Sequence, residues 1–147
     1  MVRHMKTRVL VVDDEKKLVE QISKRLTIRG FEVFQAFSGE EALELVSDTL
    51  FDVVILDVVM PGINGIETLK QIKAKSPLIE VIMLTGNASF DAAVSGLKFG
   101  AGDYLMKPCH IEVLIKKIEE ALEKREINHK KMLYAAKNEE TGFSTGN

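Results

Sequence analysis

The feature that most constrains the fold of this chain is a repeated alternation of short apolar runs and longer amphipathic segments. The apolar runs span four to seven residues each, which suits buried strands and is too short for a helix. Each run precedes a segment whose apolar residues recur three or four positions apart, as they do on one face of a helix. We predict strands over residues 8–12, 31–37, 52–56, 80–85 and 103–106.

A helix is predicted after every strand. Ser38 lies three residues before Glu41, which is the spacing of a capping box at the start of a helix. Gly96 lies inside a later helical pattern and weakens it, because glycine has a low helix propensity. The predicted helices run from near Lys17 to Gly30, over 38–46, from Gly65 to near Ser76, over 89–100, and onward from Ile111.

A strand followed by a helix, five times in succession, indicates an α/β fold. We expect a doubly wound five-stranded parallel sheet with helices on both faces. The strands over 8–12, 52–56 and 80–85 are apolar almost throughout. A central strand of such a sheet is buried on both faces, so we expect these strands to be central.

Composition and charge narrow the class of protein. No apolar run approaches the roughly 18 residues that cross a bilayer, and no secretory signal precedes the first strand. The single cysteine, Cys109, excludes an internal disulfide and fits a reducing compartment. The net charge of −2 creates no field that attracts nucleic acid. We therefore expect a cytoplasmic protein that binds neither membranes nor nucleic acid directly.

The last predicted helix has a strong apolar stripe that fades after Leu122, because Arg125 and His129 occupy the next positions on that face. Beyond this point we expect a solvated helix or one that binds a partner, such as a second copy in a homodimer. Too few residues follow for a helix-turn-helix module or an ATPase, so either a stand-alone domain or a piece of a longer protein is expected. The predicted organisation is vector-derived sequence over 1–4, a compact domain over 5–123, and a helical extension with a flexible tail over 124–147.

Polar residues stand at the carboxyl ends of four predicted strands. Asp13 and Asp14 follow the first strand, and Asp57 follows the third. Thr85 ends the fourth strand, and Lys107 follows the fifth. Parallel strands deliver their carboxyl ends to one edge, where open α/β sheets bind ligands. Carboxylates gathered there repel one another, and a hard cation such as Mg²⁺ (or Mn²⁺) relieves the repulsion. The cation and Lys107 together concentrate positive charge above Asp57. This positive charge favours an anionic ligand, and a phosphoryl group fits it best.

These motifs resemble those of response-regulator receiver domains from bacterial two-component signalling. That family has an acidic pair after the first strand and an aspartate at the end of the third, with Met-Pro-Gly just beyond. It also has a threonine or serine at the end of the fourth strand and Lys-Pro after the fifth. The resemblance covers about residues 7–123 and implies a flavodoxin-like strand order of 2-1-3-4-5. The matching segments are Asp13-Asp14, Asp57 with 60–62, Thr85-Gly86 and Lys107-Pro108.

The resemblance implies a role for each of these residues. Asp57 accepts a phosphoryl group from the phosphohistidine of a sensor histidine kinase or phosphotransfer protein. Asp14 binds the metal directly and Asp13 binds it through water. Asp57 and the backbone carbonyl of Val59 are the other metal ligands from the protein. Lys107 pairs with Asp57 and then with the phosphoryl oxygens, and the peptide bond that follows it is often cis. Without the other motifs, Asp57 would be taken to cap a turn, and Asp13 or Asp14 to cap the first helix.

The resemblance also implies a conformational switch. The hydroxyl of Thr85 hydrogen-bonds the phosphoryl group and draws the following loop inward, and Tyr104 then turns inward to fill the space. The surface of the fourth helix, fifth strand and fifth helix carries the signal to a partner. A half-buried edge aromatic residue without a switching role is the alternative interpretation of Tyr104.

Val59 and Asn87 lie two positions beyond Asp57 and Thr85, where the resemblance implies residues that tune the lifetime of the phosphoryl group. An apolar side chain at Val59 is expected to hinder the attacking water. Aspartyl-phosphate hydrolases of another fold family usually have a second acid at this position, so Val59 also argues against that class of enzyme.

The sequence thus predicts a phosphorylation-dependent switch that catalyses its own phosphotransfer and slow autodephosphorylation and is not a conventional enzyme. The alternative is a phosphorylation-independent interaction scaffold or dimerisation module. The presence of Asp57, Thr85 and Lys107 argues against this alternative, because a scaffold has no need of them.

Overall fold

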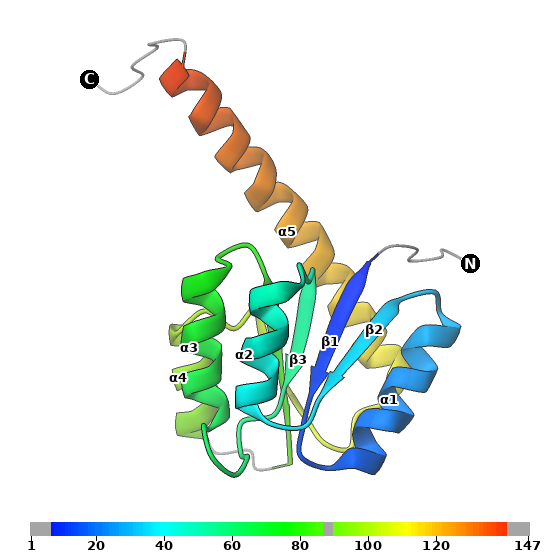
Figure 1. The fold of residues 1–147 in the computed structure, drawn as a ribbon. Helices are drawn as coiled ribbons and strands as arrows, with labels where there is room; N and C mark the ends of the chain where they lie inside the picture. Colours follow the sequence, from blue (N-terminus) through cyan, green and yellow to red (C-terminus); the bar gives the residue numbers. More distant parts are fainter. Residues whose placement is uncertain (1–6, 87–89, 141–147) are drawn as a thin grey trace.

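The computed structural model describes residues 7–86 and 90–140. Its five strands are all parallel and form one sheet in the order β2-β1-β3-β4-β5, as Figure 1 shows in part. Both the predicted fold class and the predicted strand order are confirmed. The strands are β1 (Arg8–Val12), β2 (Glu32–Ala36), β3 (Val53–Leu56), β4 (Glu80–Thr85) and β5 (Asp103–Met106).

The helices follow the strands as predicted, and each boundary lies within a few residues of the expected one. Helix α5 continues well past the residues that pack on the sheet, as the predicted extension implies. Among the described helices, none is long and apolar enough to cross a membrane. The helices are α1 (Lys16–Ile28), α2 (Gly39–Asp48), α3 (Gly65–Lys75), α4 (Phe90–Lys98) and α5 (Ile111–Glu140).

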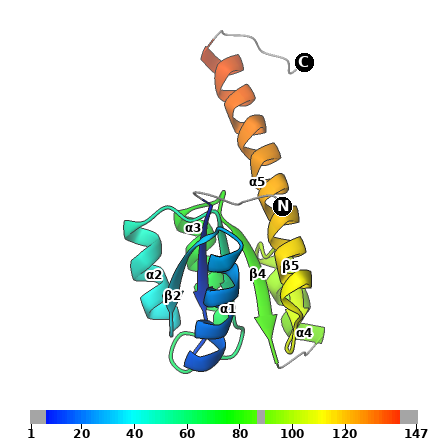
Figure 2. The same ribbon diagram turned by 90° about the vertical axis from the view of Figure 1, so that its right-hand side faces the viewer.

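Helices cover both faces of the sheet (Figures 1 and 2), and one apolar cluster of side chains lies on each face. Leu69 and Ile72 of α3 pack with Leu56 of β3 on the face that α2 and α3 cover. On the other face, Val19 of α1 and Ile118 of α5 pack with strand residues of the opposite alternation. Each central strand therefore has side chains buried on both sides, which explains why β1, β3 and β4 are apolar almost throughout.

The predicted start of α2 is confirmed in detail. The hydroxyl oxygen of Ser38 accepts a hydrogen bond from the Glu41 amide at 3.1 Å, and the Glu41 carboxylate accepts one from the Phe37 amide at 2.8 Å. Asn64 caps α3 in the same manner, because its side-chain oxygen accepts from the Glu67 amide at 2.9 Å. These caps fix where each helix begins relative to the strand before it.

Helix α5 leaves the domain at the edge where the strands begin (Figure 1). Arg125 lies 3.3 Å from the carboxylate of Asp52, just before β3, and Lys124 lies 4.0 Å from that of Glu80 in β4. Past these ion pairs the helix carries exposed apolar side chains, Ile127, Met132, Leu133 and Tyr134. The predicted helical extension is confirmed, while the boundary at 123 stays a prediction, and residues 1–4 and 141–147 lie outside the described residues.

Candidate functional site

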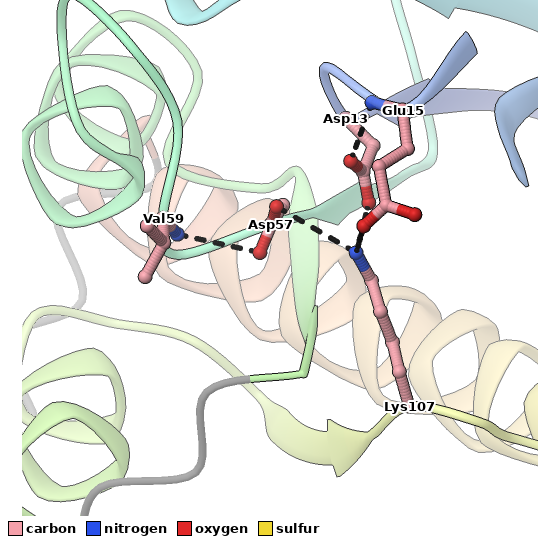
Figure 3. Close-up of polar contacts among 5 residues, drawn as sticks. All are labelled: Asp13, Glu15, Asp57, Val59 and Lys107. Carbon is pink, nitrogen blue, oxygen red and sulfur yellow. Dashed lines mark hydrogen bonds and ion pairs between the residues drawn. The ribbon is translucent and has the colours of Figure 1, made fainter.

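The acidic residues after β1 and β3 converge at the carboxyl edge of the sheet (Figure 3). One carboxylate oxygen from each of Asp13, Asp14 and Asp57 lies within 4.8 Å of the others. Asp13 and Asp57 are buried, with 4% and 5% of their surface exposed, whereas Asp14 is exposed to solvent. The three acids that sequence analysis placed together are therefore adjacent in space.

Backbone pairing holds Asp57 in this place. The Asp57 amide donates to the carbonyl of Val12 at 3.0 Å, which extends the β1–β3 ladder by one residue. Beyond the strand, the Val59 amide donates to the Asp57 carboxylate at 3.3 Å, and the Gly65 amide donates to the Val58 carbonyl at 2.8 Å. The carboxylate thus stands at the end of a rigid strand, with the following turn folded against it.

Lys107 brings a positive charge into the acidic cluster. Its amide donates to the Thr85 carbonyl at 2.9 Å, which fixes the start of the loop after β5, and its bond to Pro108 is cis. The ammonium nitrogen lies 2.6 Å from Asp13 and 3.0 Å from Glu15, but 3.7 Å from Asp57. Lys107 therefore does reach Asp57, although its shorter ion pairs join it to the two acids that follow β1.

The electrostatics of this cluster follow from burial and charge. Burial raises the pKa of the Asp13 carboxyl above its usual value, even though Lys107 donates a hydrogen bond to it. Burial also disfavours the charged form of Lys107, but its hydrogen bonds to Asp13 and Glu15, together with the negative charges of Asp13 and Asp57, outweigh burial and raise its pKa. Negative charge is thus crowded at this edge, and one ammonium group compensates only part of it.

The donor set fits a hard divalent cation. Carboxylate oxygens are the ligands that Mg²⁺ prefers, and Mg²⁺ usually keeps several waters beside one or two carboxylates. Asp13, Asp14 and Asp57 supply such oxygens from two neighbouring strand ends. A cation there also relieves the repulsion between carboxylates that burial intensifies.

Thr85 and Tyr104 flank the cluster on neighbouring strands. Thr85 is fully buried at the end of β4, and Tyr104 is half-buried in β5, where it packs against the α2–α3 side of the core. Burial and the negative charge of Asp57 raise the pKa of the Tyr104 phenol. Val59 is 54% exposed beside the cluster. Asn87 lies outside the described residues.

Sequence analysis missed two acids that contact this region. Glu15 pairs with Lys107, and its position directly after the acidic pair was the only signal in the sequence. Glu40 of α2 accepts a hydrogen bond from the Ile63 amide at 2.9 Å and so tethers the loop between β3 and α3. Nothing in the sequence around Glu40 marks this contact, because it joins residues that are 23 positions apart.

A family model for the response regulator receiver domain matches residues 9–119. The chain belongs to this family. The acidic cluster and Lys107 therefore lie within a receiver domain. The residues matched include every strand end that contributes to the cluster.

Curated relatives of this receiver domain are longer proteins. Response regulator MprA from Mycobacterium sp. (strain KMS) is 36% identical over 118 residues, which cover 80% of this chain and 51% of the relative. Transcriptional regulatory protein ZraR from Salmonella typhimurium is 41% identical over 117 residues, covering 80% of this chain and 26% of the relative. The chain thus spans about half of the first relative and about a quarter of the second.

Solved structures share the fold. A CheY-like response regulator receiver domain protein from Methanospirillum hungatei JF-1 superposes with a TM-score of 0.81 at 32% identity, covering 83% of this chain and 98% of the other. The BeF3-activated DrrB receiver domain has a TM-score of 0.74 at 34% identity, covering 81% of this chain and 99% of the other. Each of these solved chains is thus covered almost completely, while 17% and 19% of this chain lie outside the two overlaps.

Proposed function

We propose that this receiver domain is a phosphorylation-dependent switch in which Asp57 accepts a phosphoryl group from a histidine kinase or phosphotransfer protein. One observation carries the proposal: three carboxylates lie within 4.8 Å of one another, and an ammonium group lies 3.7 Å from Asp57. Carboxylates this close repel one another, and a bound cation would offset that repulsion.

In the proposed reaction, a carboxylate oxygen of Asp57 forms a bond to phosphorus while the bond from phosphorus to the donor imidazole breaks. The imidazole keeps the electron pair of the broken bond and takes up a proton. Lys107 moves toward Asp57 and pairs with the phosphoryl oxygens. Asp13 and Asp14, together with Asp57 and the Val59 carbonyl, would hold Mg²⁺ (or Mn²⁺), which would supply positive charge to offset that of the phosphoryl group.

The proposal includes a switch at Thr85 and Tyr104, which the new phosphoryl charge reorders through charged hydrogen bonds. The surface of α4, β5 and α5 carries the response. Exposed apolar side chains on these elements support this assignment, because such groups favour contact with a partner. They are Val94, Leu97, Met106 and Val113, with exposed fractions between 44% and 57%.

The α5 extension supports a second role as a dimerisation element. Ile127, Met132, Leu133 and Tyr134 are each about half exposed or more, and they lie beyond the ion pairs that tie α5 to the sheet. A homodimer would cover these side chains and leave the carboxyl edge of the sheet free. A cytoplasmic location also belongs to the proposal, and the free cysteine, Cys109, is compatible with it.

Phosphorylation of Asp57 can be tested by incubating the protein with acetyl phosphate and Mg²⁺ and measuring its intact mass. We expect a gain of one phosphoryl group in the wild type, no gain in Asp57→Asn, and no gain after chelation of the metal. Asp48→Asn is the matched control, since Asp48 is an exposed aspartate of α2 and should leave the gain unchanged. An unchanged mass in the wild type, or a gain that persists in Asp57→Asn, contradicts the proposal.

A further inference from the structure

The ammonium group of Lys107 lies among three carboxylates that differ in kind (Figure 3). Asp13 at 2.6 Å and Asp57 at 3.7 Å belong to the acidic cluster that fits a divalent cation. Glu15 at 3.0 Å does not belong to that cluster. Among the ion pairs of Lys107 within the described part of the chain, Glu15 is therefore the partner that a cation would leave free.

The three carboxylates also differ in how much of each side chain is exposed to solvent. The side chains of Asp13 and Asp57 are 5% and 6% exposed, whereas that of Glu15 is 63% exposed. Lys107 is 15% exposed and so bridges the buried cluster and its outer rim. Glu15 is held at this rim because it precedes α1 and its amide donates to the Asp13 carboxylate at 3.0 Å.

We propose that Glu15 is a positioning residue that receives the Lys107 ammonium group when a divalent cation occupies the acidic cluster. This inference rests on the metal site of the proposed function. A divalent cation and an ammonium group compete for the same carboxylate oxygens of Asp13 and Asp57. Since Lys107 already contacts Glu15, it can give up the cluster oxygens without losing its last ion pair.

Removal of Glu15 therefore has a defined consequence. Among the described residues, Lys107 then has ion pairs only with Asp13 and Asp57, so a cation must displace it from both without leaving it another partner. Cation binding therefore becomes weaker, and this loss of affinity occurs only when Lys107 is present. Glu15 also attracts the cation directly through space, but that effect is independent of Lys107 and is screened because the carboxylate is exposed.

A double-mutant cycle separates these two effects. The probe is Mg²⁺ alone, and its dissociation constant is measured by titration calorimetry for the wild type, Glu15→Gln, Lys107→Met and the double variant. We expect Glu15→Gln to weaken Mg²⁺ binding by about two- to fivefold, the range expected for one exposed ion pair. In the Lys107→Met background, the same substitution should change the dissociation constant by much less.

Glu20→Gln is the matched control, because it removes the same charge from an exposed position of α1. It should leave the dissociation constant nearly unchanged. Thermal unfolding confirms that each variant is folded, and Lys107→Gln takes the place of Lys107→Met if the latter is not.

Two results overturn the inference while leaving the metal site intact. The first is an equal effect of Glu15→Gln in both backgrounds, which would mean that Glu15 acts only through its own charge. The second is wild-type affinity in Glu15→Gln. A wild-type protein that does not bind Mg²⁺ overturns the proposed metal site, and with it this inference.

Discussion

Gly65 offers a sharp test of how the site is built, because it lies where α3 begins against the backbone that carries Asp57. A Cβ atom at this position would lie 2.1 Å from the Asp57 carbonyl oxygen and 2.5 Å from the Val58 Cα. Real Cβ atoms essentially never approach other atoms closer than 3.0 Å. Both neighbours are backbone atoms, so no side-chain rotation can relieve the contact in Gly65→Ala.

The cost of Gly65→Ala follows from that geometry. Relief of the overlap requires α3 to move away from the end of β3 by about 1 Å, since the shortest contact must grow from 2.1 Å to at least 3.0 Å. Overpacking of a tight interior costs roughly 1–3 kcal/mol, and a clash with backbone belongs at the upper end. We therefore expect Gly65→Ala to lower the free energy of unfolding by about 3 kcal/mol and Tm by roughly 10 °C.

Gly96→Ala is the matched control, because the same change is made where space is available. A Cβ atom at Gly96 would lie 3.5 Å from Cγ of Met83 and 3.9 Å from Cβ of Ala101, which are ordinary contacts. Gly96 is inside α4, where alanine is favoured over glycine by about 0.5–1 kcal/mol. This variant should be as stable as the wild type or slightly more stable.

Urea unfolding followed by circular dichroism measures both variants against the wild type. We expect Gly65→Ala to be clearly less stable than the wild type, and Gly96→Ala to be as stable or slightly more stable. Phosphorylation by acetyl phosphate should also slow in Gly65→Ala, because the shift displaces the segment that positions Asp57. A Gly65→Ala protein with wild-type stability would refute the claim that α3 and β3 are in direct backbone contact at this point.

The remaining predictions concern the loop next to the site. The hydrogen bond from the Ile63 amide lowers the pKa of Glu40 below its ordinary 4.5. Ionised Glu40 therefore stabilises the fold above pH 4.5, and this stabilisation is lost as the pH falls through the pKa of Glu40 in the folded state. Glu40→Gln keeps an acceptor that does not titrate, so its stability should fall less than that of the wild type on acidification below pH 4.5, as urea unfolding at several pH values measures. Equal acid sensitivity of the wild type and Glu40→Gln would contradict this prediction. Glu44→Gln, on the exposed face of α2, is the control. Val59→Asn should speed the decay of the phosphorylated form, measured by intact mass, because a polar side chain admits the attacking water. Identical decay rates in Val59→Asn and the wild type would remove the role assigned to Val59.

Local sequence patterns accounted for the helices and strands because their causes are local. The period of apolar residues separates strands from helices, and the spacing of Ser38 and Glu41 marks the start of α2. The apolar stripe of the last helix likewise fades visibly in the sequence after Leu122. The sequence also indicated that this helix continues past the stripe, as α5 does, although no apolar stripe marks where an exposed segment such as 126–140 ends.

The sequence by itself determined which residue types stand at each strand end, since that depends only on neighbours along the chain. It also determined that Asp13, Asp57 and Lys107 would meet, once the strands were taken as parallel. Only the tertiary structure decided how Lys107 divides its charge, with Asp13 and Glu15 closer than Asp57. That division depends on differences of about 1 Å between groups up to 94 residues apart, because ion-pair energies vary steeply with distance and burial.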